Sequence, residues 1–248
     1  MTRYAIIAGT GFETLKELEI SNQHRVATAW GKPSAPIMEG RLGNVEVLFL
    51  SRHGTDHGLA PHEINYRANV AALKDLGAEA VLAVYTVGGI TTRTQVPGTL
   101  VIPDQLIDYT WGRAQSYSMP GEVIHVDFTE PFDTALRARL VSAARIVASE
   151  SGPSVPVVDG GVYAATQGPR LETAAEVDRL ERDGCDIVGM TGMPEAGLAR
   201  ELDLPLGGIA LVVNPAAGRG GISMDEIRAV AAAGRARILQ VLAAAVAA

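Results

Sequence analysis

Residues 4–11 read Tyr-Ala-Ile-Ile-Ala-Gly-Thr-Gly, a short apolar run that ends in two glycines separated by a threonine. The run Tyr4–Ala8 has the length and composition of a buried strand, and the glycines after it are typical of a tight turn. Short β-rich runs of this kind alternate with helical patterns along the whole chain. This alternation predicts an α/β fold with a central sheet whose strands are parallel over much of its width.

The other expected elements follow from the same two periodicities. Further strands are expected at 45–50, 80–85, 99–103, 156–163, 186–190 and 207–213. Helices are expected from Pro61 to Gly77, over the stripe from Leu136 to Val147, from the capping box Thr173/Glu176 to Gly184, and from the box Ser223/Glu226 to Ala245. No repeat or long linker interrupts this order. We therefore expect one domain over residues 1–248, with a mixed, twisted sheet flanked by helices.

Composition restricts the class of protein. With 47% hydrophobic residues the 248-residue chain can bury a core, and no apolar run approaches the ~20 residues needed to span a membrane. A net charge of -7 argues against nucleic acid as a partner. The single Cys185 cannot form an internal disulfide, and the start of the chain lacks a secretory signal. We expect a cytoplasmic protein.

Two predicted strands end in residues suited to binding an anion. Thr10 lies between glycines that let backbone N–H groups approach a ligand, although the same residues also suit a plain turn. Arg52 and His53 follow the strand at 45–50, where a guanidinium and an imidazole suit an oxyanion, and the alternative is an ordinary surface loop. Two such strand ends together favour an anion site.

Two further polar residues occupy similar positions. Glu172 directly precedes the capped helix at Thr173, where the helix dipole favours its ionised form. Asn214 follows the apolar strand and precedes Pro215. The simpler interpretations are a first-turn acid and an Asn-Pro turn.

The sequence lacks the motifs of metal sites, serine hydrolases and dinucleotide-binding enzymes. The sequence has no His-Glu-x-x-His, no Gly-x-Ser-x-Gly and only one cysteine, so we expect no metal site and no serine hydrolase. Position 14 is Thr14, where a dinucleotide fingerprint needs glycine, and a phosphate-loop Gly-Lys-Ser/Thr is also missing. An NAD-dependent oxidoreductase is therefore a remote alternative.

Taken together, these segments resemble the trimeric nucleoside phosphorylases, the family that includes methylthioadenosine phosphorylase and the trimeric purine nucleoside phosphorylases. The resemblance covers nearly the whole chain. It is carried by residues 6–11 (Ile-Ile-Ala-Gly-Thr-Gly), 52–54 (Arg-His-Gly), 61–69 (Pro-His-Glu-Ile-Asn-Tyr-Arg-Ala-Asn), 103–108 (Pro-Asp-Gln-Leu-Ile-Asp), 168–170 (Gly-Pro-Arg) and 189–196 (Gly-Met-Thr-Gly-Met-Pro-Glu-Ala).

The resemblance implies the nucleoside phosphorylase fold and reversible phosphorolysis of an N-ribosidic bond, with inorganic phosphate as co-substrate and no cofactor or metal. It places Thr10, Arg52, His53 and Thr191 at phosphate, and Met190 along the ribose. At 85–86 the family usually has Thr or Asn followed by Ala. Because Tyr85 is far bulkier, we leave it out of the site and keep Thr86 through its backbone N–H.

Glu172 and Asn214 are the residues expected to select the base and assist its departure. Methylthioadenosine phosphorylases carry Ser and Asp at these positions, whereas phosphorylases of inosine and guanosine carry Glu and Asn. The Glu172 carboxylate can accept the N1–H of a 6-oxopurine, and Asn214 can donate to O6 and accept from a protonated N7. The neighbouring Leu171 is assigned to the nucleoside site.

The 5′ substituent is expected to be apolar. Ile227 falls where inosine phosphorylases of the family place a histidine, and an apolar wall favours a methylthio group. His125 matches a position that a neighbouring subunit contributes to the 5′ end, which implies a homotrimer with sites at subunit interfaces. The expected substrate is S-methyl-5′-thioinosine. Cleavage of S-methyl-5′-thioadenosine or of ordinary inosine and guanosine, and non-catalytic nucleoside binding, are the alternatives.

Overall fold

The computed structural model describes residues 2–12, 17–150 and 155–247. Its centre is the long strand β5 (Ala80–Gly89), which pairs in parallel with β1 (Tyr4–Ala8) and β11 (Leu206–Pro215). The strand β4 (Val45–Ser51) lies parallel to β1 on its other side. Residues of β1 and β5 are almost completely buried, as expected for strands covered on both faces.

The sheet is mixed, as predicted. On one side β2 (Glu19–His24), β3 (Ile37–Leu42) and β4 form an antiparallel meander. At the other end of β5, the strand β10 (Ile187–Gly189) pairs antiparallel with Gly88 and Gly89, and β9 (Val162–Ala165) and β7 (Gln105–Asp108) continue in parallel. The strands β6 (Leu100–Ile102) and β8 (Val157–Asp159) extend the sheet beyond β11.

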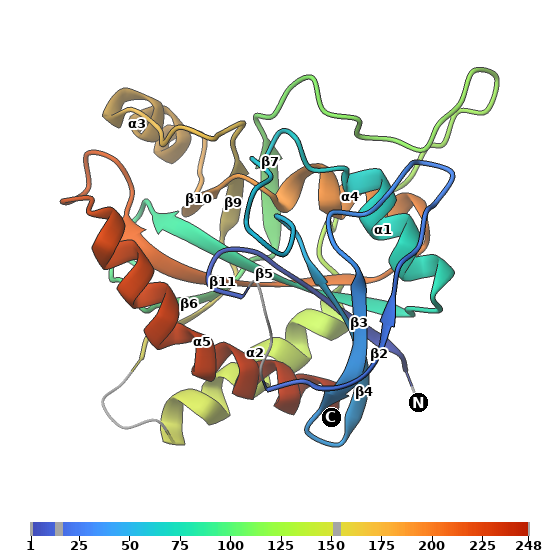
Figure 1. Ribbon diagram of the computed structural model, residues 1–248. Helices are drawn as coiled ribbons and strands as arrows, with labels where there is room; N and C mark the ends of the chain where they lie inside the picture. Colours follow the sequence, from blue (N-terminus) through green and yellow to red (C-terminus); the bar gives the residue numbers. More distant parts are fainter. Residues whose placement is uncertain (1, 13–16, 151–154, 248) are drawn as a thin grey trace.

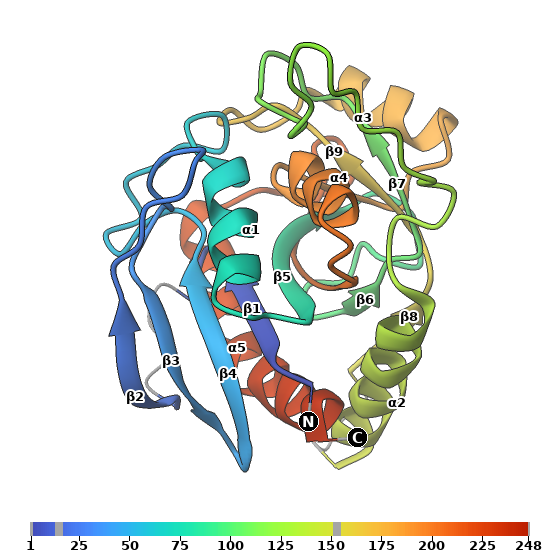
Figure 2. The ribbon, with the colours of Figure 1, turned by 90° about the vertical axis from the view of Figure 1, so that its right-hand side faces the viewer.

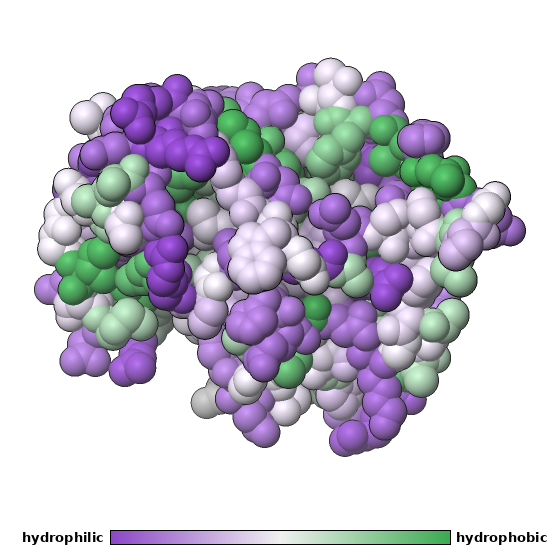
Figure 3. Space-filling view, turned by 90° about the horizontal axis from the view of Figure 1, so that it is seen from above, coloured by the Kyte–Doolittle hydropathy of each residue, from purple (hydrophilic) through white to green (hydrophobic). Residues whose placement is uncertain are grey.

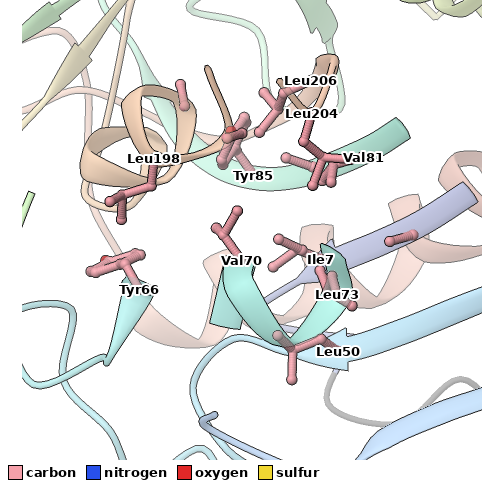
Figure 4. Close-up of a cluster of buried hydrophobic side chains, with 14 of the residues drawn as sticks. Ile7, Leu50, Tyr66, Val70, Leu73, Val81, Tyr85, Leu198, Leu204 and Leu206 are labelled. Carbon is pink, nitrogen blue, oxygen red and sulfur yellow. The ribbon is translucent and has the colours of Figure 1, made fainter. Parts of the chain in front are cut away.

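Helices cover both faces of this sheet (Figures 1 and 2). The helices α2 (Thr134–Glu150) and α5 (Met224–Ala247) pack on one face, and α1 (Tyr66–Asp75) and α4 (Gly192–Glu201) on the other. On the α1 side, Val70 and Leu73 meet Ile7 and Leu50 in a buried cluster (Figure 4). The short helix α3 (Ala174–Arg182) packs against β9 and β10 through Val177 and Leu180.

Two details differ from the sequence-based expectation. The helix expected from Pro61 begins at Tyr66, because the Asn65 side chain caps it by accepting from Ala68 N at 3.1 Å. The strand expected at 156–163 is two strands, since Gly160 and Gly161 have φ of 87° and 122° and break the extended backbone.

Within the described residues, α5 is the one helix long and apolar enough, by length and composition, to cross a membrane. The sequence offers no uninterrupted apolar run of that length here, because Arg228, Arg235 and Arg237 lie within the segment. One face of α5, including Ile238 and Leu242, is buried in the core beside α2, which is how a core helix of a globular protein packs.

Candidate active site

A cavity of about 920 Å³ lies where the carboxyl ends of the parallel strands β1, β4, β5 and β11 meet. Ligands bind at this edge of open α/β sheets, because the loops after neighbouring strands converge there. The lining contains every predicted site residue except His125: Thr10, Arg52, His53, Thr86, Leu171, Glu172, Met190, Thr191, Asn214 and Ile227. Segments far apart in the sequence thus form one site.

Three threonines line the cavity. Thr10 follows β1, Thr86 lies within β5, and Thr191 follows β10. Gly9 allows the backbone after β1 to lie close to Arg52 and His53, because a Cβ there would lie 2.9 Å from His53 Cδ2 and 3.3 Å from Arg52 Nη1. Hydroxyl donors in a cavity that a guanidinium also borders suit an oxyanion.

Arg52 is almost fully buried and bound mainly to protein. Its Nε and Nη2 each donate to the Glu195 carboxylate at 2.8 Å, Nη1 donates to Val84 O at 3.0 Å, and Nη2 to Ile7 O at 3.4 Å. These bonds use four of the five N–H groups of a guanidinium, which leaves at most one Nη1–H for a ligand. Arg52 therefore ties together β1, the middle of β5 and the first turn of α4, and it also borders the cavity.

The Arg52–Glu195 pair is a buried, two-point ion pair. Burial alone would lower the pKa of Arg52, but the charge and hydrogen bonds of Glu195 outweigh burial, and the pKa lies above its ordinary value. The guanidinium is therefore a permanent cation beside the cavity. Sequence reasoning missed the role of Glu195, although a glutamate inside the apolar segment 192–199 was a signal that it needs a buried cation.

His53 has a fixed orientation. Its Nδ1 lies 2.9 Å from Leu59 O and donates to that carbonyl. The other ring nitrogen, Nε2, faces away from Leu59. The ring of His57, which the sequence analysis did not single out, lies 4.6 Å from that of His53, and both residues line the cavity.

The structure resolves the question of Tyr85. Its side chain is buried on the α4 side of β5, near Leu198 and Leu206 (Figure 4), and it is not part of the cavity lining. Its ring packs 5.1 Å from that of Tyr163, and its hydroxyl donates to Glu195 Oε1 at 3.5 Å. Burial and the nearby Glu195 charge raise its pKa. Because neighbouring strand residues alternate, Thr86 faces the cavity instead.

Glu172 and Asn214 also line the cavity. Glu172 precedes the N-cap Thr173 of α3, and its Oε1 accepts from Thr166 Oγ1 at 2.6 Å. Asn214 follows a register irregularity between Val212 and Asn214 in β11, and its Nδ2 donates to Pro215 O at 2.6 Å. Such bulges redirect side chains at strand ends. A carboxylate and a carboxamide thus face the same space.

The remaining predicted residues form apolar walls. Met190 and Leu171 come from the loops after β10 and β9, and Ile227, 9% exposed, comes from the first turns of α5. His125 lies on the surface, within the long loop 109–133, and does not line the cavity of its own chain.

No group of three or more His, Cys, Asp or Glu within residues 2–12, 17–150 and 155–247 could hold a metal ion.

The family model of the phosphorylase superfamily matches residues 3–247. The chain belongs to this superfamily. The phosphorylase is 53% identical over 231 residues, 92% of its length and 91% of the relative's, to a probable S-methyl-5′-thioinosine phosphorylase of Pseudomonas syringae pv. tomato. It is 42% identical over 228 residues, 89% of its length and 82% of the relative's, to the 6-oxopurine nucleoside phosphorylase of Pyrococcus furiosus.

Solved structures agree with these relatives. The phosphorylase superposes on methylthioadenosine phosphorylase from Schistosoma mansoni in complex with adenine with a TM-score of 0.92 and 33% identity, covering 100% of its own length and 91% of that chain. The predicted family and the mixed, helix-flanked α/β fold are confirmed. The phosphorylase is thus a pentosyltransferase.

Proposed function

We propose that the enzyme cleaves S-methyl-5′-thioinosine with inorganic phosphate, yielding hypoxanthine and 5-methylthioribose 1-phosphate. One observation carries this proposal: the Glu172 carboxylate and the Asn214 carboxamide line the same cavity as Arg52, His53 and the threonine cluster. We assign Arg52, His53 and the three threonines to an anion-binding end and Glu172 and Asn214 to a base-reading end, which together are what phosphorolysis of a nucleoside requires. Relatives named as probable S-methyl-5′-thioinosine phosphorylases support the same substrate.

The anion end suits the attacking phosphate. Thr10, Thr86 and Thr191 offer hydroxyl donors there, and the adjoining Arg52 supplies positive potential. Glycosidic cleavage passes through an oxocarbenium-like transition state. A phosphate held under C1′ stabilises that developing positive charge and is also the nucleophile, so attack from this face inverts the configuration at C1′.

The purine end suits a 6-oxopurine. The Glu172 carboxylate accepts a hydrogen bond from N1–H, and one of its oxygens is already oriented by Thr166 Oγ1 at 2.6 Å. Asn214 donates its NH₂ to O6 and accepts from N7–H through Oδ1 as negative charge leaves with the base. Adenine presents a bare N1 and an amino group at these places, which leaves both protein groups mismatched.

Ile227 supports an apolar 5′ substituent. Its buried side chain offers no hydrogen bond to a 5′-hydroxyl, whereas a methylthio group loses little on desolvation. The similarity to the 6-oxopurine nucleoside phosphorylase of P. furiosus supports a second candidate function, the general cleavage of inosine and guanosine.

We further propose a homotrimer in which His125 reaches the 5′ end of a neighbouring site. His125 lies in the loop 109–133, which exposes Trp111 (73%), Val123 (69%) and Met119 (52%). Figure 3 has hydrophobic residues at the right-hand margin, the side toward which this loop extends in Figure 1. Large exposed apolar side chains in one loop are typical of an interface.

We also propose that the enzyme is cytoplasmic and that it uses no cofactor besides the phosphate co-substrate.

Base release from S-methyl-5′-thioinosine, S-methyl-5′-thioadenosine and inosine, each with and without phosphate, tests the substrate. We expect phosphate-dependent release of hypoxanthine from the first at the highest kcat/KM. Preference for the adenine nucleoside would contradict the roles of Glu172 and Asn214, and equal use of inosine would contradict the role of Ile227. Light scattering of the purified enzyme tests the trimer.

A further inference from the structure

Arg113 joins separate parts of the cavity wall without lining the cavity itself. It lies in the loop that follows β7, which crosses the same end of the molecule as α4 in both ribbon views (Figures 1 and 2). Its Nη1 donates to Met190 O at 2.8 Å and Met193 O at 2.7 Å. Its Nη2 donates to Gln167 O at 2.8 Å and Thr166 O at 3.3 Å.

These carbonyls belong to the two segments that would hold the nucleoside. Thr166 and Gln167 begin the turn that leads to Glu172, and the Thr166 hydroxyl orients that carboxylate. Met190 directly precedes Thr191, and both residues line the cavity. One guanidinium therefore sets the spacing between the base-reading turn and the segment along the sugar.

A third part of the wall is tied to the same group. Tyr66 Oη lies 3.3 Å from Arg113 Nη1, where it can share one of the two Nη1–H groups, and Tyr66 donates to Pro61 O at 2.9 Å. Pro61 lines the cavity. The guanidinium also lies over the Tyr66 ring, 5.5 Å from its centroid.

Four carbonyl oxygens that converge on one point need a cation with donors in a planar fork. Without it their partial negative charges repel one another and lose their hydrogen bonds, so the segments would separate until water solvates them. A lysine supplies charge at one point only and cannot reach both segments in the same way. The arginine geometry, rather than its charge alone, matches this arrangement.

We propose that Arg113 is a positioning residue for nucleoside recognition, which fixes Glu172 relative to the Met190 segment. This inference rests on the proposed function. The phosphate end depends on it less, because Thr10 and Thr86 are carried by β1 and β5, and the backbone N–H of Thr191 donates to Tyr163 Oη at 3.3 Å. Loss of Arg113 should therefore impair nucleoside binding more than phosphate binding.

Kinetics of Arg113→Met and Arg113→Lys, with Arg137→Met as a matched control, test this. Arg137 also bonds a carbonyl and a carboxylate, Pro103 O at 2.9 Å and Asp159 Oδ1 at 3.0 Å, but lies outside the cavity lining. Because displacement by about 1 Å can cost up to ~100-fold, we expect Arg113→Met to raise the nucleoside KM roughly tenfold and the phosphate KM less than about twofold. The preference for 6-oxopurine over 6-aminopurine should fall, and Arg113→Lys should be intermediate.

The control separates positioning from stability. Arg137→Met should lower the Tm and leave both KM values and the base preference unchanged. If the Arg113 variants lose only Tm or active fraction, with both KM values and the base preference of the wild type, the inference is wrong. Should Arg113→Met not fold, the same criteria apply to Arg113→Lys. Failure of the proposed function is distinct, because then the wild-type enzyme itself releases no hypoxanthine in phosphate.

Discussion

Replacing Glu195 by leucine would leave Arg52 as a buried cation without its carboxylate. The two side chains are only 2% and 1% exposed, so water cannot take the place of the lost partner. Arg52 cannot escape by losing its proton, because an arginine pKa stays above ~12 in proteins. The variant must therefore accept the cost of an unpaired charge.

The expected size of that cost follows from the contacts that remain. Breaking a buried ion pair by removing one partner costs about 3–5 kcal/mol. The bonds from Arg52 to Val84 O and Ile7 O persist, which places Glu195→Leu near the lower limit, about 3 kcal/mol. In Arg52→Met/Glu195→Leu no charge is buried, and the two carbonyls lose one donor each at about 1 kcal/mol apiece. The double variant should thus be destabilised by only about 2 kcal/mol.

Urea denaturation followed by tryptophan fluorescence measures these free energies of unfolding for the wild type, both single variants and the double variant. Strong non-additivity is expected, with the double variant more stable than either single one. Additive losses, or a loss below about 1 kcal/mol for Glu195→Leu, would refute the claim that the pair acts as one buried unit. If Glu195→Leu does not fold, Glu195→Gln completes the same cycle.

Three further predictions concern the base, the 5′ group and α3. Asn214→Asp should shift kcat/KM toward 6-aminopurines by on the order of tenfold, and an unchanged ratio would oppose its role at the base. Ile227→His should improve inosine relative to S-methyl-5′-thioinosine in the same assay. Hydrogen bonding from Arg170 lowers the pKa of Glu176 from 4.5 to about 2. Its stabilising contribution is thus complete above pH 4.5 and is lost as the pH falls through 2, so the Tm deficit of Glu176→Gln should shrink between pH 7 and about pH 3.5.

Local patterns in the sequence determined much of the framework. The apolar run Tyr4–Ala8 is a strand with those same bounds, and Thr173 and Glu176 form the predicted capping box of α3. Such elements follow from interactions within a few residues, so periodicity and cap chemistry reveal them. The segment α4 escaped detection because Met193 is non-helical in its first turn and most of its residues are buried, which removes the amphipathic stripe. The exposed edge strand β2 likewise lacks an apolar face.

The sequence by itself also placed Thr10, Arg52 and His53 directly after predicted strands, which is why they were predicted to form one anion site. Only the tertiary structure decided which way each side chain faces and what holds it. On β5, the Tyr85 side chain points toward Glu195 and away from the cavity. Arg52 was expected to bind an anion, but most of its N–H groups donate to Glu195 and to two backbone carbonyls. Residues 52 and 195 lie 143 positions apart, and no local pattern carries the energy of a contact that exists only once the chain has folded.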